Sequence, residues 1–283
     1  MAIISIARGC HSHGEQIAKK VAKKLGYECV NREILLEAVQ FFNISETRLL
    51  KSIITAPGVL DKITHGREKY IAYFQAALLE HVKNNNVVYH GHAGHLLLPD
   101  ISHILKVRII ANMQDRIALL QKLRRLTVAE AKRQILREDR DRTSWTRFLY
   151  KREIQDPALY DVVIHIGTFT IEDACEMICN IAKSKSFQAS PEAEEALKDL
   201  AVSSHIKAAL QTICEPEITS HNGMVHITVS PGKVRKSGFS RPDMQSQLEE
   251  TIQSELSKNI NEIAYSIPGV KHVVCDIGKP DLL

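Results

Sequence analysis

The sequence predicts an α/β protein in which helices cover both faces of a parallel sheet, followed by a smaller α+β domain. Over residues 1–183, apolar runs of strand length alternate with amphipathic helical stretches. Each run is almost continuously apolar, which is typical of parallel strands buried on both faces. Residues 184–191 are polar and include proline, as expected for a linker, and residues 192–283 show a different order of elements.

Length and composition agree with two domains in a globular protein. The chain has 283 residues, 44% of them apolar and 25% charged, enough to bury a core without disulfides or metal. No apolar run reaches the roughly 20 residues of a membrane span, and the first residues lack the basic region of a secretory signal. Six cysteines occur without a CxxC pair, which favours a reducing compartment. We therefore expect a cytoplasmic protein.

Positive charge is concentrated in one segment. The net charge is +4, yet residues 116–152 hold 12 Lys/Arg against 4 Asp/Glu, a local +8 that leaves −4 for the rest. Such a segment indicates an anionic ligand. A solvated helix face is the alternative explanation, and charge alone does not decide between them.

The elements of the first domain follow from hydrophobic periodicity and from glycine and proline signals. A strand at residues 2–6 leads into a glycine- and histidine-rich loop, and a helix runs from Gly14 to a stop at Gly26. A helix is expected within 33–56, followed by a break at Pro57 and Gly58, a helix at 70–82 and a strand at 87–89. After these come a strand at 104–111, a long basic helical segment, a strand at 161–166 and a helix at 171–183.

The second domain is expected to contain a helix at about 192–213, two strands near 217–230, a helix at about 244–265 and a strand at about 270–277. Val225, Ile227 and Val229 alternate with polar residues. This alternation predicts a strand that is buried on one face only.

The loop after the first strand is a candidate phosphate site. It reads Gly9-Cys10-His11-Ser12-His13-Gly14. Between a strand and a helix, such a loop can direct backbone N–H groups and a helix N-terminus at an anion. The usual pattern continues with Lys and Ser/Thr, but here Glu15 and Gln16 follow. We expect residues 9–16 to bind a nucleotide phosphate.

Four stretches, in order, resemble one known family. The segment ISIARGCHSHGEQIAKKVAKKLGYECVNREILLEA is similar to the N-terminus of the cytidylate kinase-like family of P-loop nucleoside monophosphate kinases. VVYHGHAG at 87–94, LREDRDR at 136–142 and DPALYDVVIHI at 156–166 resemble its third strand, lid and last strand. The resemblance covers about residues 1–183. It implies a P-loop kinase fold that transfers a phosphoryl group from ATP, with Mg²⁺, to a pyrimidine nucleoside monophosphate such as CMP or dCMP.

Basic residues are candidates for phosphate contacts. Arg137, Arg140 and Arg142 correspond to the family's lid, which implies a catalytic role in neutralising phosphate charge; a solvated helix with local ion pairs is the alternative. The candidate substrate-binding residues are Arg8, Arg32, Arg67 and His92. Arg8 and Arg32 are expected at the ligand-binding edge of the sheet. For Arg67 and His92, the resemblance to the family implies a place in the substrate site.

Several positions differ from the family pattern. Glu15 stands where a basic residue is usual, Asn31 replaces an acidic residue, and His92 replaces an arginine. These differences, with Gln16, motivate an alternative: a catalytically degenerate nucleotide-binding sensor or adaptor. The sequence assigns no residue to Mg²⁺.

Histidines and cysteines allow further interpretations. His11 and His13 lie in the loop, and His90, His92 and His95 surround the end of the third strand. These imidazoles can bind a transition metal or phosphate, or simply bond backbone groups. Cys175 and Cys179 belong to an apolar helix stripe and are expected in the core. Cys10 precedes a helix N-terminus, where a thiol pKa tends to fall.

Residues 192–283 resemble the BON domain, a small bacterial α+β module, in element order and in the stretches VHITV and PGVKHVVCDIG. The resemblance implies a regulatory module that contacts the envelope or lipid. The segment Pro231–Asp243 carries Lys233, Arg235, Lys236 and Arg241 and is expected to be an exposed basic loop. The sequence shows no RNA-stacking aromatic pattern, so nucleic acid is not an expected partner. The oligomeric state is not predicted.

Overall fold

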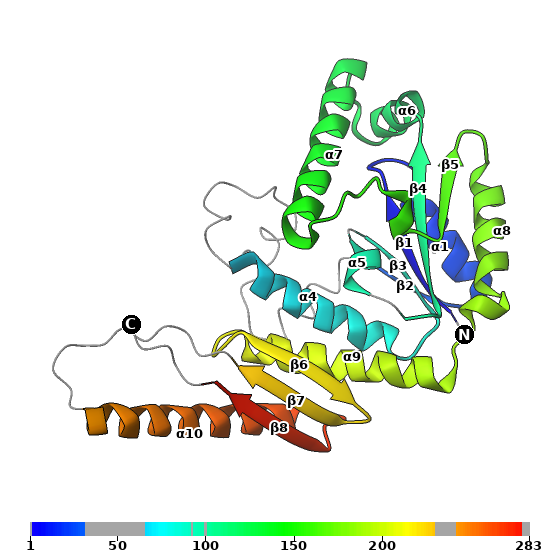
Figure 1. The fold of residues 1–283 in the computed structure, drawn as a ribbon. Coiled ribbons are helices and arrows are strands. Elements are labelled where there is room, and N and C mark those ends of the chain that lie inside the picture. Colours follow the sequence, from blue (N-terminus) through cyan, green and yellow to red (C-terminus); the bar gives the residue numbers. More distant parts are fainter. Residues whose placement is uncertain (1, 32–65, 92, 99–100, 230–241, 279–283) are drawn as a thin grey trace. The chain divides into compact units, whose positions relative to one another are not determined.

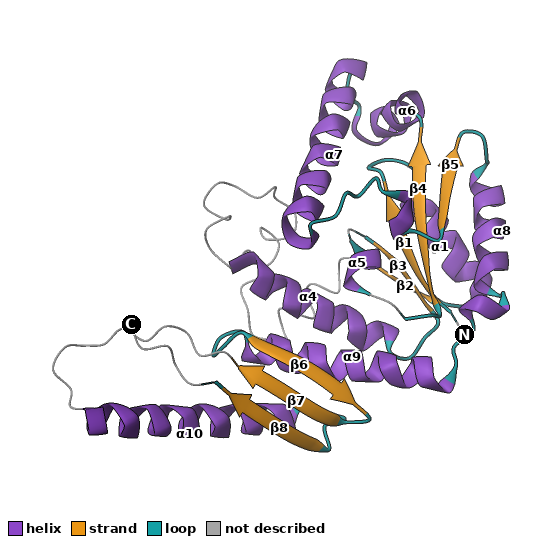
Figure 2. Cartoon of the chain, in the orientation of Figure 1, coloured by secondary structure: helices purple, strands orange, loops and turns teal. Residues whose placement is uncertain are grey.

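The chain forms two compact units, Met1–Glu194 and Glu195–Leu283. The structure is a computed structural model that describes residues 2–31, 66–91, 93–98, 101–229 and 242–278. Each unit has an apolar core of its own. Figure 1 follows the chain along the sequence, and Figure 2 shows the distribution of helices and strands.

A five-stranded parallel sheet forms the centre of the first unit. Its strands are β1 (Ile3–Arg8), β2 (Glu28–Val30), β3 (Val87–His90), β4 (Ile104–Ala111) and β5 (Val162–Ile166). They lie in the order β2-β3-β1-β4-β5, and Ser5 of β1 is in register with Tyr89 and Lys106. The carboxyl ends of β1, β3 and β4 therefore meet at one edge, where open α/β sheets bind ligands. The predicted parallel α/β sheet is confirmed.

Helices cover both faces of this sheet. On one face, α1 (Gly14–Leu25) and α8 (Ile171–Ala182) pack against apolar residues of β1, β4 and β5. Cys175 and Cys179 of α8 are buried in that core, as their apolar stripe predicts. On the other face, α5 (Gly94–Leu97) contacts β1, and α4 (Gly66–Val82) brings Phe74 to 6.3 Å from Tyr89 between ring centroids.

The long basic segment after β4 forms two helices rather than one. α6 (Met113–Arg124) ends at Arg125, whose φ is 52°, and α7 (Val128–Tyr150) begins after Thr127. The Thr127 side chain accepts from the Glu130 N–H, and the Glu130 carboxylate accepts from the Thr127 N–H. This capping box fixes the start of α7. α6 follows directly at the carboxyl end of β4 (Figure 1).

The end of the first unit is mostly regular. A short 3-10 helix, η2 (Pro157–Leu159), precedes β5. The stretch predicted as a linker contains another 3-10 helix, η3 (Lys185–Phe187), and α9 (Pro191–Leu210) begins at its end. The helix expected within 33–56 and the break at Pro57 and Gly58 lie outside the described residues.

The second unit has a three-stranded mixed sheet. After α9 come β6 (Pro216–His221), β7 (Met224–Val229), α10 (Pro242–Ser266) and β8 (His272–Ile277), the predicted order of elements. β6 and β7 are antiparallel, whereas β7 and β8 are parallel. Val225, Ile227 and Val229 are buried and the alternate residues are exposed, which confirms a strand buried on one face. The basic loop at 231–243 lies almost wholly outside the described residues.

A membrane-spanning helix would need a long and nearly uncharged apolar run. None of the helices in the described ranges meets this requirement.

Candidate active site

The loop from Gly9 to Gly14 joins the carboxyl end of β1 to α1. His11 and His13 have φ angles of 57° and 64°, a left-handed conformation that turns the backbone sharply. A Cβ on Gly14 would lie 2.7 Å from the Cβ of Arg8, so α1 can approach the end of β1 this closely only with glycine there. The strand, loop and helix thus have the arrangement of a phosphate cradle.

Ser12 fixes the shape of this loop from within. Its Oγ lies 2.9 Å from the Gly9 carbonyl oxygen and 3.1 Å from that of Ile109, and the hydroxyl is fully buried. The Gly9 N–H also donates to the Ile109 carbonyl, at 3.1 Å. The loop is therefore tied to β4 by its own hydrogen bonds, and the Ser12 hydroxyl is engaged by backbone carbonyl groups.

Cys10 connects the loop to α7. Its backbone N–H donates to Asp139 Oδ1 over 3.3 Å, and its sulfur lies 3.1 Å from the same oxygen. The side chain is buried among Ile117, Leu120 and Ile135. The Asp139 carboxylate of α7 thus accepts a hydrogen bond from a loop N–H group. In phosphate cradles, such N–H groups bind anions.

The environment of the Cys10 thiol corrects the expectation of a lowered pKa. Burial and then the negative charge of Asp139 raise this pKa to about 12, although Arg116 and Arg142 act in the opposite direction. The helix N-terminus does not compensate for the loss of water around the sulfur. Cys10 therefore stays protonated at neutral pH.

Arg116, in the first turns of α6, is the centre of the loop contacts. Its Nε donates to the Cys10 carbonyl oxygen at 2.8 Å, and its Nη2 lies 2.9 Å from the Cys10 sulfur and 2.6 Å from Asp139 Oδ2. The side chain is only 11% exposed. A cation is thus held against the loop, and a charge-assisted pair of this kind orients it firmly.

The three lid arginines do not lie together on one face. Arg142 Nη1 donates to the Arg8 carbonyl oxygen at 3.0 Å, which places this guanidinium at the loop. Arg137 and Arg140 are exposed on α7. Among the described residues, only Arg142 of the three bonds to the end of β1 next to the loop. Asp139 pairs with Arg116 rather than with a neighbouring lid arginine.

The contacts of Arg116 and Asp139 with the loop were not predicted from the sequence. The signal for Asp139 is the helix period: Ala131 and Ile135 are buried, and a residue four further on lies on the same face. For Arg116 the only local signal is its place directly after β4, at the ligand-binding edge.

The acidic residue at the end of the loop has basic neighbours. Glu15 Oε1 lies 2.9 Å from Lys19 Nζ, and Glu15 Oε2 lies 3.9 Å from Arg8 Nη2. The hydrogen bond from Lys19 is the main reason why the pKa of Glu15 is lowered. Gln16 is exposed, with Oε1 3.4 Å from Nδ1 of His13. Glu15 is therefore ionised at neutral pH, but nearby cations offset its charge.

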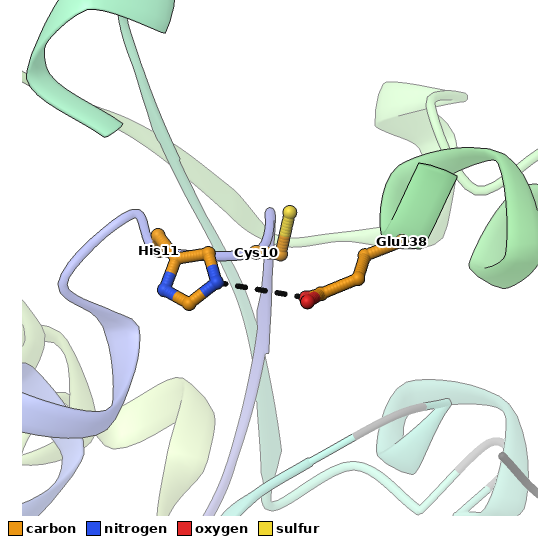
Figure 3. Close-up of side chains that lie close together, drawn as sticks. All are labelled: Cys10, His11 and Glu138. Carbon is orange, nitrogen blue, oxygen red and sulfur yellow. Dashed lines mark ion pairs between the residues drawn. The ribbon is translucent and has the colours of Figure 1, made fainter. Parts of the chain in front are cut away.

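His11 faces α7. Its Nε2 lies 3.6 Å from Glu138 Oε2, and Figure 3 shows the two side chains pointing toward each other with Cys10 beside them. Suitable ligand atoms of the three residues all lie within 4.8 Å of one another. His11, together with the Gln134 amide, lowers the pKa of Glu138 to about 2 against the effect of burial.

The remaining predicted residues lie elsewhere. Arg32 and His92 are outside the described residues, and Arg67 is in the first turn of α4 with a side chain that is not described. β1 and β3 are neighbours as expected. His95, however, is buried against Tyr160, with ring centroids 4.6 Å apart, so it does not join the loop histidines.

Known proteins resemble part of this chain. Residues 3–168 match the cytidylate kinase-like family. The crystal structure of an uncharacterized protein from Eubacterium ventriosum ATCC 27560 is similar over 65% of this chain and 100% of that chain, with 18% identity and a TM-score of 0.50, which shows a shared fold.

Two shikimate kinases are also similar, at lower scores. The enzyme from Bacteroides thetaiotaomicron has 12% identity and a TM-score of 0.40, over 65% of this chain and 99% of that one. The enzyme from Acinetobacter baumannii, in complex with shikimate, has 12% identity and a TM-score of 0.38, over 66% and 96%. No curated protein matches the sequence.

The family match spans more than half of the chain and includes β1 to β5 with the loop and α7. This chain belongs to the cytidylate kinase-like family.

Proposed function

We propose that the protein transfers the γ-phosphoryl group of ATP to a pyrimidine nucleoside monophosphate of the CMP or dCMP type. The observation that carries the proposal is the set of hydrogen bonds around the loop after β1. The Cys10 N–H donates to a carboxylate, Arg116 donates to the Cys10 carbonyl oxygen, and Arg142 donates to the carbonyl oxygen of Arg8, just before the loop. In the reaction the bond between the γ-phosphorus and the bridging oxygen breaks. A phosphate oxygen of the acceptor forms the new bond, which yields ADP and a nucleoside diphosphate.

The residues at the loop suit this chemistry. Phosphoryl transfer depends on positioning and on neutralising charge over the phosphate oxygens. In our proposal the amides of residues 9–14 bind the phosphates of ATP, with Glu15 and Gln16 at the loop exit. Arg116 and Arg142 then supply the positive charge that a loop lysine supplies elsewhere, because guanidinium groups can pair two oxygens at once.

The site fits an anionic ligand and a hard cation. The Cys10 N–H donates to the Asp139 carboxylate. An anion that displaces this carboxylate can accept the same hydrogen bond. Glu15 and Gln16 present oxygen atoms in the first turn of α1, the donor type that Mg²⁺ takes. Bound Mg²⁺ would neutralise charge between the phosphates.

The other predicted residues belong to the proposal at the acceptor side. We assign Arg8, Arg32, Arg67 and His92 to the monophosphate, and Arg137 and Arg140 to phosphates reached when α7 moves relative to the loop. Lids of this kind exclude water when they close.

An ADP-release assay of the full chain with CMP, dCMP and UMP tests the proposal. We expect turnover with at least one of them and a loss of about 10-fold or more in kcat/KM for Arg142→Ala. The matched control is Arg133→Ala, because Arg133 is exposed on the same helix; its activity should equal wild type. The proposal fails if no nucleotide is phosphorylated at high enzyme concentration.

The alternative is a nucleotide sensor without turnover. Glu15 at the loop favours it, since a carboxylate near the phosphates opposes catalysis. Titration calorimetry with ATP separates the two: binding without ADP release supports the sensor, and absence of binding rejects both.

For the second unit we propose a BON-like regulatory module, joined through residues 184–191, that contacts the envelope or lipid. The support is the element order from α9 to β8 and its mixed sheet. Sedimentation of the full chain with anionic vesicles tests it, and equal recovery with neutral vesicles would contradict an electrostatic contact. We propose a cytoplasmic location for the whole chain.

A further inference from the structure

We propose that Cys10, His11 and Glu138 form a binding site for a divalent transition metal ion of the zinc type. Two of these side chains come from the loop and the third from α7 (Figure 3). Their ligand atoms, a sulfur, a ring nitrogen and a carboxylate oxygen, all lie within 4.8 Å of one another. The inference goes beyond the proposed kinase activity and does not depend on it.

The ligand types favour zinc over magnesium. Thiolate and imidazole are the preferred ligands of Zn²⁺, and a carboxylate often completes the set, whereas Mg²⁺ prefers oxygen alone. Three protein ligands leave a fourth tetrahedral position for water, as in open zinc sites.

The buried nitrogen of His11 supplies an independent observation. Its Nε2 is shielded from solvent and, within the described ranges, makes no hydrogen bond of ordinary length. It forms a long ion pair with Glu138, whose Oε2 is 3.6 Å away. A metal ion between these two atoms would satisfy both more fully than this long contact.

Neighbouring residues already orient two of the ligands. Gln134 Nε2 donates to Glu138 Oε1 at 2.8 Å, which leaves Oε2 on the side of His11. Arg116 Nη2 lies 2.9 Å from the Cys10 sulfur, an N–H donor of the kind that supports a metal-bound thiolate. Such outer contacts fix ligand geometry and tune metal affinity.

The charges of the three ligand groups match a divalent ion. Arg116 is neutralised by Asp139 at 2.6 Å, so this guanidinium does not exclude a second cation. When the metal binds, the Cys10 S–H bond breaks, its proton passes to solvent and a sulfur–metal bond forms. The thiolate and Glu138 then offset the two positive charges of the metal.

The site would couple α7 to the loop. Each of these elements contributes ligands, so a bound ion would hold Glu138 and the loop in fixed relation. The metal would thus restrict movement of α7 relative to the loop.

Titration of the full, nucleotide-free chain with Co²⁺ tests the site. We expect one equivalent to produce tetrahedral cobalt absorption and a sulfur-to-cobalt charge-transfer band, both removed by Zn²⁺. Cys10→Ser should abolish the charge-transfer band. Glu138→Gln should weaken Co²⁺ binding about 10-fold or more.

Matched controls identify the site. Cys29→Ser removes a half-buried thiol of β2, and His13→Asn removes the other loop histidine. Both variants should bind Co²⁺ as the wild type does. Circular dichroism checks the fold of each variant, and Glu138→Gln keeps the test valid if Cys10→Ser does not fold. The inference is overturned if wild type gives no charge-transfer band, or if Cys10→Ser or a folded Glu138→Gln binds like wild type.

Discussion

His95 shows how strongly one buried residue can depend on its surroundings. The residue is 3% exposed, and its ring packs at a tilt against Tyr160. Loss of water, followed by the positive charges of Lys106 and Arg108, lowers its pKa to about 3. The folded protein therefore keeps this imidazole neutral at pH values where the unfolded chain protonates it.

The consequence is a loss of stability on mild acidification. Below the ordinary pKa of about 6.5 the unfolded state binds an extra proton, so the free energy of unfolding falls as pH falls toward 3. From pH 7 to pH 5 this residue alone should cost about 2 kcal/mol. Denaturant unfolding of wild type and His95→Phe at both pH values measures the effect. Phe keeps the ring against Tyr160, so the variant should lose about 2 kcal/mol less; equal losses would contradict the assignment.

Among the contacts between elements, the one between the loop and α7 matters most for the proposed nucleotide site. Asp139 holds the Cys10 N–H and the Arg116 guanidinium at once. In our proposal the phosphates of ATP need the same two donors, so Asp139 would compete with the ligand. The helix that we propose as a lid would then carry a competitor for the proposed site.

Removal of this competitor should strengthen nucleotide binding. Asp139→Asn replaces the charged acceptor with a neutral amide that holds the Cys10 N–H and Arg116 less strongly, so ATP should bind about 3- to 10-fold more tightly by calorimetry. The same change leaves Arg116 without its carboxylate and should lower the free energy of unfolding by about 1–3 kcal/mol. Asp141→Asn, on the same helix, is the control and should alter neither. Unchanged or weaker ATP binding by Asp139→Asn would refute the competition.

Most of the elements could be predicted from the sequence, but the contacts between elements far apart in the chain could not. The apolar run before Gly9 and the stop at Gly26 define β1 and α1 through local physics alone. Asp139 is 129 residues away from Cys10, and no local pattern specifies such a pair. Arg137 and Arg140 were expected at the loop because the resemblance includes them, whereas the buried face of α7 is set by Ala131 and Ile135.

At the scale of the whole molecule, the two cores are separate sets of residues. The nucleotide site of our proposal lies entirely in Met1–Glu194, and the mixed sheet lies in Glu195–Leu283. A ligand stabilises only the cooperative unit that binds it.

Calorimetric melting should therefore resolve two transitions that respond differently to nucleotide. A non-hydrolysable ATP analogue at about 100 times its Kd should stabilise the first unit by about 2.7 kcal/mol. This should raise one midpoint by several degrees and leave the other in place. A single transition, or an equal shift of both, would show that the units unfold together.

The buried hydroxyl of Ser12 has one more consequence. Its bonds to Gly9 and Ile109 hold the turn in shape before any ligand arrives. Binding of the phosphate that we propose would then spend little entropy on arranging the chain. Replacement of that single oxygen would weaken recognition without touching the ligand itself.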